Sequence, residues 1–119
     1  MKKRYFVNFT NHPVGEWDER QRKEAEKYGE IVDFPFPMVD ASEGEDYIEK
    51  LAQESVEKIE AYQPCVVLCQ GEFTLCYKMV CYLREKGIKV MAACSKRMVT
   101  SHGNRKEVIF LFERFREYR

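Results

Sequence analysis

Residues 64–74 read Pro-Cys-Val-Val-Leu-Cys-Gln-Gly-Glu-Phe-Thr, and this stretch decides the fold. Five apolar residues run unbroken through 65–69 between a proline and a polar turn, which is typical of a short strand buried on both faces. The turn at 70–72 contains one glycine, and from Phe73 onward the apolar spacing becomes helical. A central strand that meets a helix N-terminus at a polar loop is where an open α/β sheet usually holds its ligand.

Strand-like and helical segments alternate on both sides of this stretch. Strands are predicted at residues 3–10, 30–34, 65–69 and 88–94, helices at 18–28, 42–62 and 73–86, and a β-hairpin from 98–101 and 107–112. This pattern predicts one domain, 1–119, with a Rossmann-like, mostly parallel α/β sheet of order 2-1-3-4 and the hairpin at one edge. The direction in which successive strands are added to the sheet would then reverse, which places the topological switch point between the first and third strands. Residues 113–119 are predicted to be a tail.

Two helix starts carry capping signals. Asp18 is predicted to be the N-cap of the first helix. Ser42 and Glu45 have the spacing of a capping box, which would begin the second helix.

Composition limits the partners. The 119 residues carry 20 basic and 20 acidic side chains, so no overall field attracts DNA or an acidic membrane. No apolar run approaches the ~18 residues of a membrane span, and a cytoplasmic location is expected. The five cysteines lack a Cys-x-x-Cys pair and are interpreted as buried reduced thiols, without a metal. Neither common nucleotide fingerprint is present, and no cofactor is expected.

The helix from Phe73 to Lys86 is apolar on nearly every side. A single sheet covers only one face of such a helix. A homodimer that buries the remaining face is therefore expected, because two-fold dimers are the commonest oligomers.

Polar residues should converge at the carboxyl ends of the strands. They are rich in neutral donors and include one histidine and two cations, and the amides of residues 71–74 add a helix N-terminus suited to phosphate, provided that the acidic Glu72 points outward. Each has a structural alternative as a turn residue, a strand cap or a solvated side chain. The set comprises Thr10, Asn11, His12, Gln70, Gly71, Glu72, Phe73, Thr74, Ser95, Lys96 and Arg97.

The segments 8–13, 67–74, 92–97 and 112–118 together resemble small stand-alone CRISPR-associated proteins of type III systems. These proteins have a CARF-like domain (CRISPR-associated Rossmann fold). The resemblance implies a homodimer that binds a cyclic oligoadenylate, with cyclic tetra-adenylate as the expected ring. It also implies a ring nuclease, an enzyme that opens the ring and ends the antiviral signal.

The resemblance also assigns roles to residues. Gln70, Gly71, Phe73 and Thr74 would hold the ligand backbone, with Thr10, Glu72 and Lys96 beside them, and Ser95 and Arg97 would contact phosphates. The catalytic set would be Asn11, His12 and Arg97, with His12 as general acid. Each ribose 2′-hydroxyl can attack its neighbouring phosphate once aligned, so positioning and charge stabilisation can supply most of the rate without a metal. A sensor or sponge that binds the ring intact, and an unrelated nucleotide-binding α/β protein, remain as alternatives.

Overall fold

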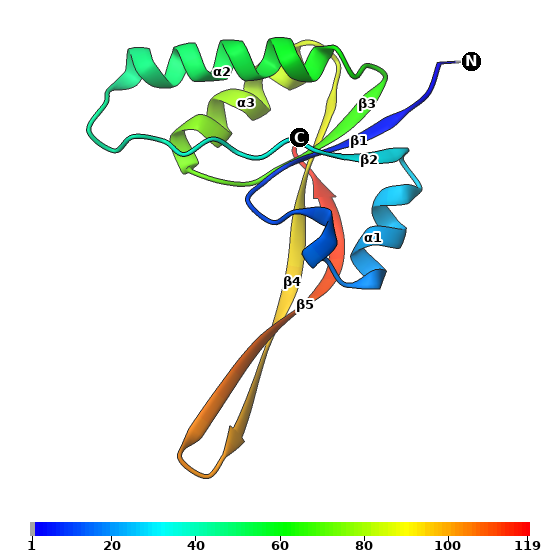
Figure 1. Ribbon diagram of the computed structural model, residues 1–119, viewed down its shortest axis with the longest axis vertical. Coiled ribbons are helices and arrows are strands. Elements are labelled where there is room, and N and C mark those ends of the chain that lie inside the picture. Colours follow the sequence, from blue (N-terminus) through cyan, green and yellow to red (C-terminus); the bar gives the residue numbers. More distant parts are fainter. Residues whose placement is uncertain (1) are drawn as a thin grey trace.

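A computed structural model describes residues 2–119 and has a five-stranded sheet of order β2-β1-β3-β4-β5 (Figure 1). The first four strands are parallel and β5 is antiparallel to β4. This arrangement confirms the mostly parallel α/β fold and is consistent with a Rossmann-like sheet. The strands are β1 (Tyr5–Phe9), β2 (Glu30–Asp33), β3 (Cys65–Cys69), β4 (Lys89–His102) and β5 (Arg105–Glu117), and the helices are η1 (Val14–Glu16), α1 (Glu19–Glu26), α2 (Glu45–Glu60) and α3 (Phe73–Glu85).

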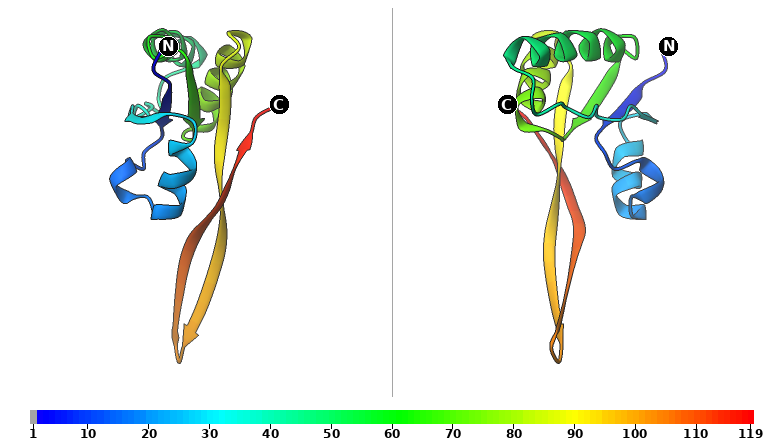
Figure 2. Two further views of the ribbon diagram at one scale, coloured as in Figure 1. Left: turned by 90° about the vertical axis from the view of Figure 1, so that its right-hand side faces the viewer. Right: turned by 60° about the vertical axis from the view of Figure 1, so that its left-hand side comes forward.

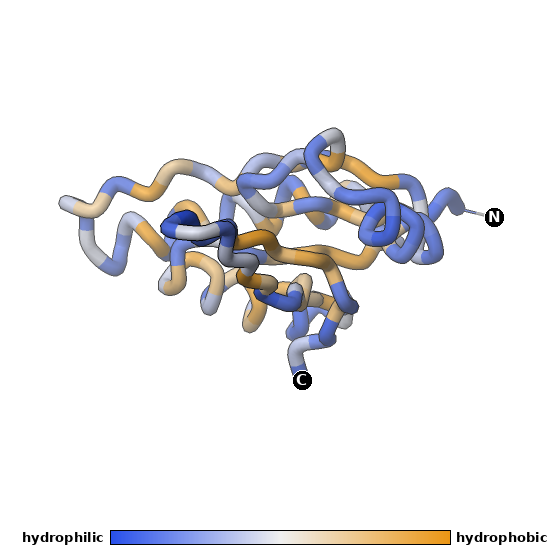
Figure 3. The backbone as a smooth tube through the Cα atoms, turned by 90° about the horizontal axis from the view of Figure 1, so that it is seen from below, coloured by the Kyte–Doolittle hydropathy of each residue, from blue (hydrophilic) through white to orange (hydrophobic). Residues whose placement is uncertain are grey.

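The sheet carries an apolar core on each face. Val7, Phe9 and Val67 belong to the core beneath α2 and α3, whereas Phe6 and Leu68 belong to the core that α1 and β5 cover. Successive residues of β1 and β3 thus serve opposite faces, as strand geometry requires. Figure 3 shows these apolar stretches running through the middle of the body, with largely hydrophilic loops around them. Burial on both faces explains why the inner strands read as continuous apolar runs.

The N-cap predicted for α1 is confirmed, whereas the one predicted for α2 is not. The Asp18 carboxylate accepts a hydrogen bond from the Gln21 amide, as predicted for an N-cap. The capping box prediction was wrong, because α2 has Gly44 as its N-cap and no side-chain cap. The Ser42 hydroxyl instead donates to Asp40 at 2.8 Å. A local turn around Asp40 therefore competes successfully for the serine.

The prediction for the C-terminal third was wrong in its element boundaries. A separate strand, a separate hairpin and a tail were expected, but β4 runs unbroken through 14 residues and β5 through 13. The polar residues 95–97 were interpreted as a break, yet each pairs across to β5 after a register shift between Cys94 and Ser95. Paired strands satisfy their backbone groups regardless of side-chain polarity, so charged residues on an exposed ribbon do not end a strand.

The far part of the β4–β5 ribbon projects away from the body, and we call residues 95–111 the arm (Figure 1). Both views in Figure 2 show the ribbon extending beyond the rest of the sheet. The radius of gyration is 15.9 Å, compared with roughly 13.5 Å for a compact domain of this length. Every residue of the arm is exposed. The structure therefore consists of a compact body and an extended arm.

Helix α3 carries apolar residues on more than its inner face. Leu75, Met79 and Leu83 are fully buried, but Phe73 is 89% and Tyr77 is 70% exposed. The sequence expectation of apolar surface beyond the sheet-facing side is met at these two aromatic residues. None of the helices within residues 2–119 has the length and apolarity needed to cross a membrane.

Candidate functional site at the carboxyl edge

A pocket of about 570 Å³ lies at the carboxyl ends of β1 and β3 and beside the middle of β4. Four of the predicted site residues line it together: Thr10, His12, Gln70 and Ser95. They come from three segments that are far apart in the chain. These segments meet because each follows its parallel strand to the same edge of the sheet. We call this cavity the edge pocket. Its other lining residues are Glu16, Trp17, Asp18, Gln21, Leu68, Ala93, Phe110 and Phe112.

A buried polar network supports the loop that contributes Thr10 and His12. The Asn8 side chain donates to the His12 carbonyl at 2.8 Å and to Asp33 at 2.9 Å. The Thr10 hydroxyl donates to the Asn8 amide oxygen at 2.8 Å and accepts from the His12 amide at 3.1 Å. Because Asn8 is 1% exposed, losing a partner would leave polar atoms unsatisfied in the core. The network thus fixes the backbone of residues 8–12.

His12 has a fixed main chain and an exposed side chain. Its carbonyl also accepts from the Trp17 indole nitrogen at 2.9 Å, so β1 and the segment before α1 hold the same group. His12 is among the residues that line the edge pocket, and it is exposed to solvent. An imidazole in this position can donate a proton to a ligand or accept one from it.

Gln70 joins the edges of two strands. Its side-chain oxygen accepts from the Ala93 amide at 2.8 Å, which continues the β3–β4 pairing past the end of β3. The oxygen is thereby committed to the protein backbone. The amide NH₂ is the group through which Gln70 can contact a ligand.

The N-terminus of α3 differs from the expected phosphate site. The Glu72 carboxylate accepts from the Leu75 amide at 2.9 Å, the Thr74 amide at 3.3 Å and the Thr74 hydroxyl. The bond from the Thr74 hydroxyl, followed by the backbone amides, holds the pKa of Glu72 below its ordinary value. Two of the amides expected to bind an anion are therefore occupied by an internal carboxylate. Gly71 has a packing role, because an added Cβ would lie 2.6 Å from the Phe36 ring.

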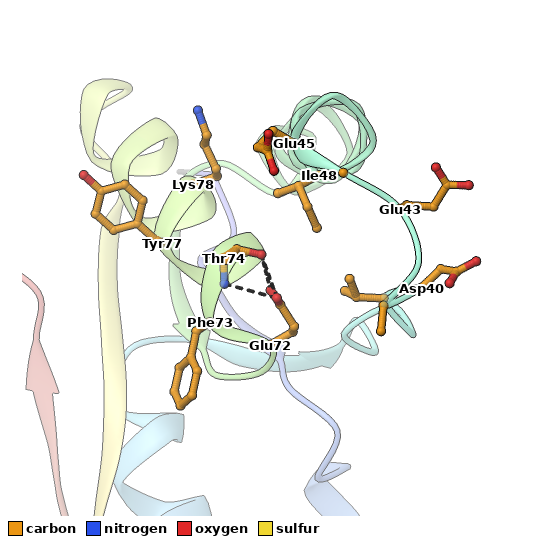
Figure 4. Close-up of a pocket in the computed structure, with 12 residues that line it drawn as sticks. Asp40, Glu43, Glu45, Ile48, Glu72, Phe73, Thr74, Tyr77 and Lys78 are labelled. Atoms are coloured by element: carbon orange, nitrogen blue, oxygen red, sulfur yellow. Dashed lines mark hydrogen bonds between the residues drawn. The ribbon is translucent and has the colours of Figure 1, made fainter.

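The remaining predicted residues lie outside the edge pocket. Asn11 lines a separate hollow of about 250 Å³ beside Pro13 and Pro35. Glu72, Phe73 and Thr74 line another pocket between α2 and α3 (Figure 4). Lys96 and Arg97 lie on the exposed arm. Arg97 stands two residues after Ser95, so strand alternation places it on the same face of the ribbon, farther from the body.

Several contributors were missed from the sequence. Asn8 interrupts the otherwise apolar β1 and Asp33 ends β2, and these two polar positions were the available signal for the network. The acidic residues Glu16 and Asp18 also line the edge pocket, as do Phe110 and Phe112 from β5. No Lys or Arg lines the pocket within residues 2–119. A polyanion bound here would need cations from the arm or from a second chain.

Two thiols lie close together behind the β3–α3 loop. The Sγ atoms of Cys69 and Cys76 are 3.6 Å apart. Their hydrogen bond lowers the pKa of Cys76 and raises the pKa of Cys69, and burial raises the latter further. All five cysteines are free. Within residues 2–119 no group of three His, Cys, Asp or Glu side chains has an arrangement that could hold a metal ion.

The sheet order and the edge pocket define a small, mostly parallel α/β fold, consistent with a Rossmann-like sheet, with a polar cavity at its carboxyl edge. The chain belongs to the Uncharacterized protein MJ1673 family, whose profile matches residues 4–116. No curated protein and no solved structure matches the chain. The match covers the body and the arm alike, so both are parts of the family's domain.

Proposed function

We propose that the protein binds a cyclic oligoadenylate, with cyclic tetra-adenylate as the ring, and opens it as a cytoplasmic ring nuclease. The observation that carries the proposal is the edge pocket, where Thr10, His12, Gln70 and Ser95 meet at the carboxyl edge of the sheet's body. Hydroxyl, amide and imidazole groups in one cavity suit the phosphates and base edges of an oligonucleotide. The resemblance to CARF-like proteins supports the same ligand.

The reaction follows from the ligand's own chemistry. A ribose 2′-oxygen attacks the adjacent phosphorus, its proton leaves to solvent, and the P–O5′ bond breaks to give a 2′,3′-cyclic phosphate. The departing 5′-oxygen needs a proton, and His12 is proposed as the general acid that donates it. Holding the three reacting atoms in line and stabilising phosphate charge are the protein's further contributions, and the latter is proposed for Ser95 and Arg97.

The ring is proposed to lie at the interface of a homodimer, with the exposed face of α3 as part of the contact. A two-fold axis suits a symmetric ring, since each chain then presents the same groups to half of the ligand. Within the described part of the chain, the lining of the edge pocket includes no Lys or Arg. The cations that neutralise the ring's phosphates would therefore have to come from outside the pocket, which supports this arrangement. Two arms would bring two copies of Lys96 and Arg97 to the ligand.

A non-catalytic sponge is the second candidate. Asn11 and Arg97, two of the three proposed catalytic residues, do not line the edge pocket with His12. A protein that only sequesters the ring needs no such convergence. This observation favours binding without cleavage and makes the product the deciding evidence.

Incubation of the pure protein with labelled cyclic tetra-adenylate in EDTA separates the candidates. A linear product ending in a 2′,3′-cyclic phosphate is expected, and tight binding of an intact ring would leave only the sponge. If neither cyclic tetra-adenylate nor cyclic hexa-adenylate binds, the proposed ligand class is wrong. Arg97→Ala should weaken binding about 10-fold or more through loss of a charged contact. The matched Arg22→Ala, on the outer side of α1, should bind like the wild type.

A further inference from the structure

The middle of the arm carries apolar residues on both faces of the ribbon. Cross-strand pairing places Met98 opposite Ile109 on one face and Val99 opposite Val108 on the other. These side chains are 38–46% exposed, and Phe110 is 66% exposed. A two-stranded ribbon is at best marginally stable in water unless something packs against it. The arm therefore has the composition of a segment that is covered in the assembled protein.

The arm and the body carry opposite charge. Residues 95–111 contain four Lys or Arg side chains and one Glu, a net charge of +3. Because the whole chain is neutral, the rest of it carries −3. Two copies of this chain can therefore attract one another through arm and body although each copy is neutral.

An acidic apolar surface of the body matches the arm. A groove of about 590 Å³ lies between the N-terminal ends of α2 and α3, and we call it the acidic groove. Figure 4 shows Phe73 and Tyr77 projecting from α3, with the carboxylates of Asp40 and Glu43 on the loop at the opposite side. Glu45 adds a further carboxylate. A groove with exposed aromatic rings on one side and carboxylates on the other complements a ribbon of aliphatic, Lys and Arg side chains.

The positions of the two surfaces permit reciprocal contact. The arm leaves the body at the carboxyl edge of the sheet, and the acidic groove lies where α2 and α3 begin, at that same edge. Eight β4 residues, from Ser95 to His102, span about 26 Å at strand rise. Two chains that face each other edge to edge can each extend an arm along the partner, and a two-fold axis closes this exchange.

We infer that the arm of each chain docks on the acidic groove of a second copy, giving an arm-exchanged homodimer. The contact covers apolar residues of the arm together with Phe73 and Tyr77, and pairs Arg105 and Lys106 with the groove carboxylates. The inference shares a second copy with the proposed function but involves no nucleotide. It therefore stands or falls separately from ring binding.

Charge reversal and rescue test the contact. Sedimentation without ligand should show a wild-type dimer, and R105E/K106E or E43K/E45K should each raise its dissociation constant at least about 10-fold. Combining all four substitutions should restore dimerisation, because each reversed arm then meets a reversed groove. The matched E54K/E57K, on exposed positions of α2, should leave the dimer intact and should not rescue the arm variant.

A shortened arm gives the independent readout. Joining Met98 to Ile109 through Asn-Gly keeps their pairing and removes the tip. This variant should retain the wild-type far-UV circular dichroism of the body and sediment as a monomer. A wild-type monomer, a shortened-arm dimer, or a quadruple variant as weak as the arm variant would overturn the inference. Binding of single-stranded polyadenylate by the arm of such a monomer would show that the arm contacts nucleic acid instead of a second chain.

Discussion

The two halves of β4 contain similar residues in opposite surroundings. Val90 and Met91, in the body, are 0% and 3% exposed, whereas Met98 and Val99, in the arm, are 38% and 46% exposed. Both pairs lie in one continuous strand with its antiparallel partner beside it. The difference arises from the layers above and below, which the body has and the arm lacks. Strand propensity thus forms the arm, but only packing against another surface can stabilise it.

The largest expected effect is on the rate of ring opening, and it should differ between the histidine of the body, His12, and the histidine of the arm, His102. His12→Ala should slow ring opening about 10²–10⁴-fold through loss of the general acid, with binding of the ring largely retained. Single-turnover cleavage in EDTA measures the rate, and a binding titration measures the affinity. His102→Ala, at the end of the arm, is the matched control and should cleave like the wild type. Full activity of His12→Ala would remove the proposed role of His12.

The next effect compares buried and exposed aliphatic side chains. Leu68→Ala, at a site 1% exposed, should lower the free energy of unfolding by about 2–5 kcal/mol. Ile109→Ala in the arm is 45% exposed and should cost under about 0.5 kcal/mol when measured on dilute monomer. Urea denaturation followed by circular dichroism gives both values. Equal losses would show that the arm is as firmly packed as the body.

A smaller effect is expected at the buried network. Asn8→Ala removes the partner of Asp33, Thr10 and the His12 carbonyl, and should lower stability by about 1–3 kcal/mol. It should also weaken ring binding, because residues 10–12 lose their support. Asn104→Ala at the arm turn serves as the matched control for both measurements. Unchanged stability of Asn8→Ala would contradict the network's role in positioning the edge pocket.

The smallest effect concerns thiol reactivity, which reports on the body alone because the arm contains no cysteine. The Cys69 hydrogen bond lowers the pKa of Cys76, whereas burial raises the pKa of Cys65 to about 11. Near neutral pH Cys76 should therefore hold more thiolate and react with iodoacetamide at least about 10-fold faster than Cys65. Its rate should fall as the pH drops below its folded-state pKa. Mass spectrometry of alkylated peptides provides the measurement, and equal rates would contradict the thiol pair.

The sequence was sufficient to predict the arrangement of the body. The apolar run at 65–69, the alternation of elements and the reversal between the first and third strands led to the observed order of the parallel strands. The same reasoning brought Thr10, His12, Gln70 and Ser95 to one cavity. These results depend on local pattern and on chain connectivity, which a single sequence contains.

Other features depend on the direction of a side chain or on pairing with a remote strand. Glu72 could face solvent or its own helix, and only the structure shows its carboxylate on the Thr74 and Leu75 amides. Ser95 looked like the end of a strand because its pairing with Phe112 is not visible in the local sequence. The position of Arg97 depends on that same pairing. The extent of β4 and the position of Arg97 were therefore mispredicted, because both depend on pairing with β5.

Stoichiometry is the most direct measurement of the central claim, a nucleotide ring bound between two chains. Titration of the wild-type protein with a 2′-deoxy analogue of cyclic tetra-adenylate, which lacks the attacking hydroxyl, should give one ring per two chains. Sedimentation of the same sample should show a dimer. One ring per chain, or no binding of the analogue and of the natural ring, would contradict the account.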